Sequence, residues 1–175
     1  MNIELKPAVM SDLDIIRNLY YKLLDSSEIY STILRWKKGV YPSDTDWIPY
    51  IKNNEMYLTL LDGDLVGAVV ITKSQTKEYQ NIPWQINIAD EEVSVIHLLA
   101  IDPKQQGKGL ATVILDEVIK NAIAMKKRAV RLDAISTNIP AQKLYEKYGF
   151  INCGTQQLYY ASTGWTSFVF YEYLL

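Results

Sequence analysis

Apolar residues recur along the chain with two different periods, and the period predicts which element each segment forms. Apolar residues three and four positions apart indicate a helix with one buried face, whereas short alternating or continuous apolar runs between turn residues indicate strands. The predicted helices span residues 11–26, 28–38, 109–127 and 139–148. The predicted strands span residues 3–7, 56–61, 65–73, 93–101, 129–135, 150–160 and 165–173.

Residues at the ends of these segments set the expected boundaries. Ser11 is the expected N-cap of the first helix, and Gly39 is expected to end the second. Ser43 and Asp44 are expected to cap a short amphipathic segment that Pro49 interrupts.

The order of the predicted elements indicates one domain over residues 1–175, an α/β (α+β) fold in which helices flank a mixed sheet. The Asp62-Gly63 pair predicts a tight hairpin between the second and third strands. Residues 74–92 are polar and irregular, and a loop of this length in a compact domain is usually functional or mobile.

Composition and charge limit the classes of function. Of the 175 residues, 49% are hydrophobic and 22% are charged, as in an ordinary globular domain. Eighteen Lys and Arg against twenty Asp and Glu leave a net charge of −2, which gives no electrostatic basis for binding nucleic acid. No apolar run reaches the ~20 residues needed to span a bilayer, and the first residues lack signal-peptide features. We therefore expect a cytoplasmic protein that binds neither nucleic acid nor a membrane.

The chain holds a single cysteine, Cys153, and a single histidine, His97. One cysteine excludes an internal disulfide framework and a cysteine-based metal cluster, and one histidine excludes a multi-histidine site. We expect a metal-independent protein in which Cys153 fills space in the core.

A strand, a small flexible turn and a long helix follow one another over residues 93–111. The apolar run of residues 93–101 ends at Asp102-Pro103, and Gln106-Gly107-Lys108-Gly109-Leu110-Ala111 then leads into the helix. The unpaired N–H groups and the dipole of a helix N-terminus favour an anion, most often a phosphate. The spacing excludes a Walker motif, and a dinucleotide fingerprint fits poorly because Thr112 stands where its third glycine belongs.

Two segments together resemble a known family. Gln106-x-x-Gly109-x-Ala111 resembles the Gln/Arg-x-x-Gly-x-Gly/Ala signature of the GNAT superfamily of N-acetyltransferases. The segment from Asn138 to Phe150, NIPAQKLYEKYGF, resembles the family's Asn-x-x-Ala-x-x-Leu-Tyr-x-x-x-Gly-Phe pattern. The resemblance implies the GNAT acyl-CoA N-acyltransferase fold, a splayed mixed sheet flanked by helices. It also implies transfer of the acetyl group of acetyl-CoA, as co-substrate, to a primary amine by direct attack in a ternary complex.

The resemblance assigns roles to particular positions. Tyr145 corresponds to the general acid that protonates the departing thiolate, and the N–H of Leu99 is a candidate donor to the oxyanion. The residues expected to bind acetyl-CoA are Leu99, Ala100 and Ile101 through the main chain, the turn residues Gly107, Lys108, Gly109, Leu110, Ala111 and Thr112, and Asn138 and Tyr145. For Asn138 a helix N-cap is an alternative role.

The proton acceptor is left open by the sequence. His97 stands where many family members have a glutamate, and an imidazole with a pKa of ~6.5 can accept a proton near neutral pH. A packed core histidine is equally compatible with this position, and Glu91, Glu92 and Asp133 are further carboxylates that could lie near the cleft.

The acceptor amine is not identified by the sequence, and a small-molecule amine and a peptide N-terminus are both compatible. The chain has thirteen Tyr and four Trp but three Phe. The segments expected to line the acceptor cleft contain the aromatic residues Tyr30, Trp36, Tyr41, Trp47, Tyr50 and Trp84, and acidic residues that could attract a cation, Glu28, Asp44, Asp46 and Glu91. Family resemblance also suggests a homodimer. The alternatives are a non-catalytic acyl-CoA-binding or sensing module on the same fold, and a protein that binds another phosphate ligand at the turn.

Overall fold

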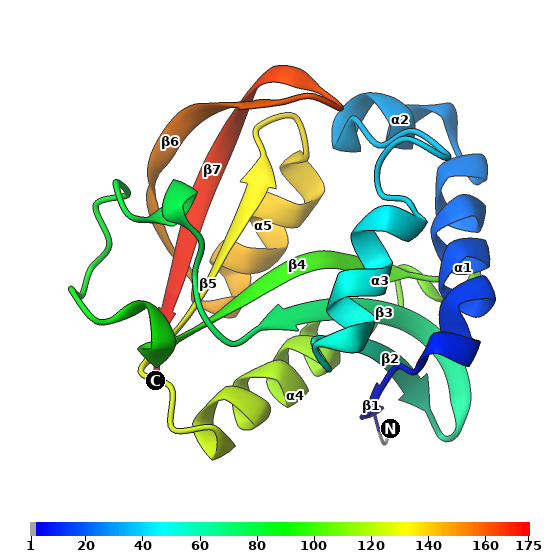
Figure 1. Cartoon of the computed structure of the whole chain (residues 1–175), viewed down its shortest axis with the longest axis horizontal. Coiled ribbons are helices and arrows are strands. Elements are labelled where there is room, and N and C mark those ends of the chain that lie inside the picture. Colours follow the sequence, from blue (N-terminus) through cyan, green and yellow to red (C-terminus); the bar gives the residue numbers. More distant parts are fainter. Residues whose placement is uncertain (1–2) are drawn as a thin grey trace.

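The computed structural model describes residues 3–175. The strands of this part of the chain form one seven-stranded sheet (Figure 1). The strand order is β1-β2-β3-β4-β5-β7-β6; β4 and β5 are parallel, and every other neighbouring pair is antiparallel. The strands are β1 (Ile3–Pro7), β2 (Met56–Leu61), β3 (Asp64–Thr72), β4 (Val93–Ile101), β5 (Ala129–Ile135), β6 (Ile151–Tyr160) and β7 (Gly164–Leu174).

Helices cover both faces of the sheet because apolar side chains alternate between the two faces along each strand. On β3, Val69 packs in a cluster with Ile114 and Leu115, whereas its neighbour Val70 packs in a cluster with Ile16 and Leu19. The helices are α1 (Leu13–Asp25), α2 (Glu28–Leu34), α3 (Asp44–Lys52), α4 (Leu110–Ala124) and α5 (Ile139–Tyr148). Thus α4 and α5 cover one face, and α1 and α3 cover part of the other (Figure 1).

Several predicted boundaries are confirmed, others differ by one to three residues, and three expectations about the helices are wrong. The strands over residues 3–7, 93–101 and 129–135 and the helix over residues 139–148 have the predicted bounds. Ser11 lies in a 3-10 turn, and the Asp12 carboxylate instead accepts a hydrogen bond from the Val9 N–H at 2.9 Å before α1 begins. The second helix ends at Leu34, because Arg35 adopts a left-handed conformation with φ of 54°. Pro49 lies within α3 and does not interrupt it.

The central strand β4 carries a bulge. His97 pairs with Val70 and Ala100 with Ala68, so two residues of β4, Leu98 and Leu99, lie opposite one residue of β3. Leu98 has φ of 51°, and its carbonyl accepts a hydrogen bond of 2.5 Å from the buried Tyr20 hydroxyl on α1. A bulge bends the strand that contains it. The parallel ladder between β4 and β5 ends at the pair Ile96–Leu132, and beyond it the two strands diverge (Figure 1).

The segment of residues 73–92 is held against the sheet by a buried ion pair. Arg131 on β5 and Glu172 on β7 lie 2.7 Å apart and are 1% and 0% exposed. The Arg131 guanidinium also donates to the Gln75 side chain and the Ile86 carbonyl, and the Gln85 N–H donates to Glu172. These contacts satisfy both charges away from water, so the segment has a fixed position over β5 and β7.

Candidate active site

A cavity of about 350 Å³ lies where β4 and β5 diverge. Its walls come from both strands, α5, the end of α2, residues 76–79 and the hairpin between β6 and β7. The lining residues that carry polar or titratable groups include His97, Asp133, Tyr145, Asn138, Tyr79, Glu78, Tyr50, Tyr41 and Tyr160. The cavity therefore brings together residues from β4, from the Asn138–Phe150 motif and from the long irregular segment of residues 74–92.

His97 lies on β4 directly after the last pair of the parallel ladder, and its imidazole lines the cavity. The rings of Tyr50 and Tyr79 each lie 6.3 Å from the imidazole, measured between centroids. Burial lowers the pKa of His97, while the negative charges of Asp133 and Glu55 oppose that shift. The imidazole is therefore neutral at pH 7 and has the capacity to accept a proton.

Asp133 lies on β5 at the corresponding position after the divergence and lines the same cavity. Its carboxylate accepts a hydrogen bond of 2.5 Å from the Tyr79 hydroxyl. Burial raises the pKa of Asp133, and His97 and Tyr79 oppose the shift. The sequence suggested Asp133 as one of three carboxylates but gave no signal for Tyr79, since the segment that contains it has no periodic pattern.

Tyr145 lines the cavity from the face of the sheet opposite to that of His97 and Asp133. It lies on α5, is 7% exposed, and packs in the cluster under α4 and α5. Burial, and then the charge of Asp133, raise the pKa of its hydroxyl, which therefore stays protonated over a wide pH range. No hydrogen bond among residues 3–175 uses this hydroxyl. The gap between β4 and β5 thus joins His97 and Asp133 on one face to Tyr145 on the other.

The turn before α4 carries main-chain donors without partners. Gly107 and Gly109 have φ of 75° and 76°, a conformation that favours glycine. Within the described chain, no hydrogen bond uses the N–H groups of residues 107–111, whereas the Thr112 N–H donates to the Gly109 carbonyl at 3.1 Å. The Lys108 ammonium contacts the Gln105 side chain at 2.8 Å. Five free N–H groups at a helix N-terminus fit a pyrophosphate.

The remaining predicted binding residues lie between this turn and the cavity. Leu99, Ala100 and Ile101 have no partner in β5, so the edge of β4 is open beyond Ile96. The Ile101 carbonyl accepts a hydrogen bond from Gln106, whose carboxamide oxygen accepts one from Tyr30 on α2. This open edge and the donors of the turn fit the long arm and the pyrophosphate of acetyl-CoA.

Asn138 caps α5 and also lines the cavity. Its side-chain oxygen accepts a hydrogen bond of 3.3 Å from the Ala141 N–H. Asn138, Ala141 and Tyr145 are three, four and seven residues apart, so they share the face of α5 that borders the cavity.

Several residues suggested by the sequence lie elsewhere. Glu92 pairs with Arg128, and neither it nor Glu91 lines the cavity. Asp44 pairs with Arg17, and Asp46 caps α3 through Ser43.

Of the aromatic residues suggested by the sequence, three line the cavity: Trp36, Tyr41 and Tyr50. The others lie elsewhere: Trp47 is fully buried in the core, Trp84 covers Arg131, and Tyr30 contacts Gln106.

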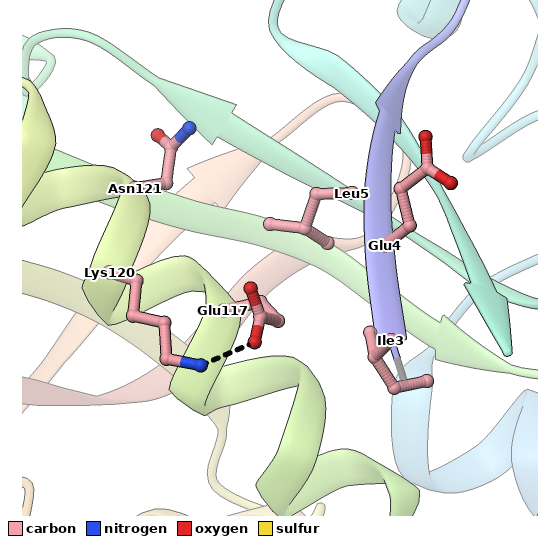
Figure 2. Close-up of a pocket in the computed structure, with 6 residues that line it drawn as sticks. All are labelled: Ile3, Glu4, Leu5, Glu117, Lys120 and Asn121. Carbon is pink, nitrogen blue, oxygen red and sulfur yellow. Dashed lines mark hydrogen bonds and ion pairs between the residues drawn. The ribbon is translucent and has the colours of Figure 1, made fainter. Parts of the chain in front are cut away.

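A second hollow, of about 500 Å³, lies between β1 and α4 (Figure 2). It is lined by Ile3, Glu4, Leu5, Glu117, Lys120 and Asn121, and it shares no residue with the cavity. Lys120 and Glu117 form an ion pair of 2.7 Å there (Figure 2). This hollow contains no residue of either motif.

Residues 3–175 contain no group of three or more His, Cys, Asp or Glu side chains placed to hold a metal ion. In the same part of the chain, no helix has the length and apolar character needed to cross a membrane.

Comparison with known proteins assigns the family. A model of the acetyltransferase (GNAT) family matches residues 20–150, which include the turn, β4, β5 and α5. The chain belongs to the acetyltransferase (GNAT) family. The GNAT family consists of acetyl-CoA-dependent acyltransferases, so acetyl-CoA is the co-substrate.

Two curated relatives of this GNAT chain are N-acetyltransferases by name. L-amino acid N-acetyltransferase AaaT of Escherichia coli is 25% identical over 166 residues, which cover 93% of this chain and 91% of that protein. An uncharacterized N-acetyltransferase of Methanocaldococcus jannaschii is 25% identical over 140 residues, which cover 79% of this chain and 56% of that protein. The chain thus spans little more than half the length of the second relative.

Solved structures share the GNAT fold. A GNAT-family acetyltransferase from Streptococcus agalactiae has a TM-score of 0.76 at 20% identity, with 99% of this chain and 95% of that chain covered. The yncA protein of Salmonella typhimurium, solved with its cofactor acetyl-CoA, has a TM-score of 0.69 at 16% identity, with 100% and 95% covered. At these identities the likeness establishes the fold alone.

Proposed function

We propose that this protein is an N-acetyltransferase that transfers the acetyl group of acetyl-CoA to a primary amine by direct attack in a ternary complex. One observation carries the proposal. A neutral imidazole from one face of the sheet and a protonated phenol from the other line a single cavity at the end of the parallel ladder. Such a site can remove a proton from an ammonium ion and deliver one to a thiolate without exposing either step to bulk water.

His97 and Tyr145 have complementary tasks in this proposal. His97 accepts the proton that the ammonium of the acceptor must lose, directly or through water, and the charge of Asp133 stabilises the imidazolium that results. The Leu99 N–H donates a hydrogen bond to the carbonyl oxygen as negative charge develops on it. Tyr145 donates its proton to the sulfur when the C–S bond breaks, and the second proton of the nitrogen, which is lost as the amide forms, restores the phenol. The acetyl thioester supplies the electrophilic carbon.

The donors of residues 107–111 and the open edge of β4 position the co-substrate. The main-chain N–H groups of the turn would hold the pyrophosphate, and the groups of Leu99, Ala100 and Ile101 without partners in β5 would pair with the amides of the pantetheine arm. Asn138 borders the arm from α5. The homodimer suggested by family resemblance stays a prediction.

A thiol-release assay with acetyl-CoA and a panel of primary amines tests the proposal, in parallel with calorimetric titration of CoA. We expect CoA to bind and thiol release to depend on the amine. Binding of CoA with no amine-dependent release would overturn the proposed reaction and favour a non-catalytic acyl-CoA-binding module. Absence of CoA binding would overturn the assignment of the turn.

A further inference from the structure

The cavity has an uneven balance of charge. Among the residues that line it, Asp133 and Glu78 are acidic, and none is Lys or Arg, although the chain contains eighteen of these. The Thr76 side chain lowers the pKa of Glu78, which is therefore ionised at neutral pH. The cavity thus carries two carboxyl groups, one on the half-buried Asp133 and one on the exposed Glu78.

Two arginines on segments that border the cavity, Arg131 on β5 and Arg35 after α2, are engaged elsewhere. The Arg131 guanidinium is 1% exposed, is bonded to Glu172, Gln75 and the Ile86 carbonyl, and lies under the Trp84 ring at 4.2 Å. Arg35 donates from one nitrogen to the Thr166 hydroxyl and to two carbonyls at the tip of the β6–β7 hairpin. Neither lines the cavity, so no Lys or Arg side chain of the lining is available to pair with a carboxylate of the acceptor.

Seven of the residues that line the cavity are aromatic. They comprise Trp36, Tyr41, Tyr50, Tyr79, Tyr145, Tyr160 and Phe168. The faces of aromatic rings attract cations and pack against apolar groups, whereas an unpaired carboxylate loses its hydration there without compensation. A volume of about 350 Å³ accommodates a small molecule.

We propose that the acceptor is a small primary amine with an apolar or aromatic body and no carboxylate, and that Asp133 and Glu78 select it against the corresponding amino acid. This inference rests on the proposed function and specifies its acceptor. It differs from the acceptor in the name of the Escherichia coli relative, because an amino acid brings a carboxylate for which the lining of this cavity has no Lys or Arg partner.

Three probes that share one ring system separate charge from size: 2-phenylethylamine, L-phenylalanine and L-phenylalanine amide. We expect kcat/KM for 2-phenylethylamine and for the amide to exceed that for phenylalanine at least tenfold, because the amide keeps the extra volume but loses the charge. Equal or higher kcat/KM for phenylalanine would overturn the inference. A tetrapeptide amide with an N-terminal Phe that is acetylated faster than 2-phenylethylamine would also overturn it, in favour of a peptide acceptor.

The variant Glu78→Gln tests the charge of Glu78, and Glu91→Gln is the matched control, since Glu91 is exposed and lies outside the cavity. We expect Glu78→Gln to raise KM for 2-phenylethylamine, leave kcat nearly unchanged, and reduce its advantage over phenylalanine severalfold. Glu91→Gln should change none of these. An unchanged ratio in Glu78→Gln would remove Glu78 from the proposed selectivity.

Binding of the same probes to the protein–CoA complex, measured by calorimetry, distinguishes failure of this inference from failure of the proposed function. If no probe is acetylated but 2-phenylethylamine still binds at least tenfold more tightly than phenylalanine, the reaction is wrong and the selectivity holds. Equal binding, or none, overturns the selectivity.

Discussion

The Tyr79 hydroxyl donates a hydrogen bond of 2.5 Å to the Asp133 carboxylate, across 54 positions of sequence. This bond joins the segment of residues 73–92 to β5 at the edge of the cavity, and the Tyr79 ring also lies edge-on to His97. An aromatic ring, a carboxylate and an imidazole from three separate segments therefore form one polar cluster. The proton acceptor of the proposed reaction is best understood as this cluster, with His97 as the group that takes the proton.

Replacement of Tyr145 by Phe tests the proton donor. Tyr145→Phe removes the hydroxyl and keeps the packing of the ring, so we expect kcat to fall by about 10²-fold or more while the affinity for acetyl-CoA changes little. Tyr148→Phe is the matched control on the same helix, because the Tyr148 hydroxyl bonds Asp116 outside the cavity. Steady-state kinetics and CoA titration measure both variants. Equal kcat values for the two variants would exclude Tyr145 as the acid.

The pH dependence of kcat tests His97. Because burial lowers the pKa of His97, we expect the rate to fall only as the pH drops below the ordinary imidazole value of about 6.5, where His97 becomes protonated. His97→Gln should abolish this acid limb and reduce kcat by about 10²-fold or more. A profile with the same acid limb in the variant would assign the limb to another group.

Asp133→Asn tests the electrostatic link within the cluster. The Asp133 charge raises the pKa of His97, so its removal should lower that pKa further and move the acid limb of kcat to lower pH. The asparagine oxygen still accepts the hydrogen bond from Tyr79, which keeps the segment in place. The measurement is kcat between about pH 5 and 9. A limb that moves to higher pH would show that Asp133 does not act on His97 through its charge.

Gly109 is expected to be required for both the turn and its donors. With φ of 76° and no atom within 4 Å of an added Cβ, Gly109→Ala strains the backbone without a clash. We expect a loss of about 1 kcal/mol in the free energy of unfolding and a higher KM for acetyl-CoA. Gly63→Ala in the β2–β3 turn, where φ is 93° with the same open space, should cost similar stability and leave KM unchanged. Similar KM values in both variants would argue against a pyrophosphate at the turn.

The buried pair Arg131–Glu172 is expected to hold the segment that supplies Tyr79 and Glu78. Arg131→Met leaves the Glu172 carboxylate buried without its partner, which costs about 3–5 kcal/mol in the free energy of unfolding. Adding Glu172→Gln removes the unpaired charge, so the double variant should recover part of that loss. Denaturant unfolding measures all three proteins. A double variant less stable than Arg131→Met would show that the unpaired charge is not the main cost.

Local sequence patterns determined the elements on either side of the site. The apolar run of β4, the glycine turn and the Asn138–Gly149 segment each depend on interactions between near neighbours, so their bounds could be predicted from periodicity and caps. Their expected roles came from the resemblance to the GNAT family. Prediction from periodicity and caps failed at Ser11, Arg35 and Pro49, because a hydrogen bond from the Val9 N–H to the Asp12 carboxylate, a left-handed residue and packing of α3 outweighed propensity there.

The tertiary structure alone decided which polar groups meet. Tyr79 and Glu78 lie in a segment without periodicity, and their position depends on the buried Arg131–Glu172 pair. The sequence did not distinguish Asp133 from the other candidate carboxylates, whereas the register of β4 and β5 places it beside His97. The bulge at Leu98, supported by Tyr20 from α1, ends the parallel ladder and lets residues from both faces share one cavity. These contacts join residues far apart in the chain, and a pattern of neighbouring residues carries no information about such distances. The sequence thus determined the fold and the conformation of the glycine turn, and long-range packing decided which residues line the cavity.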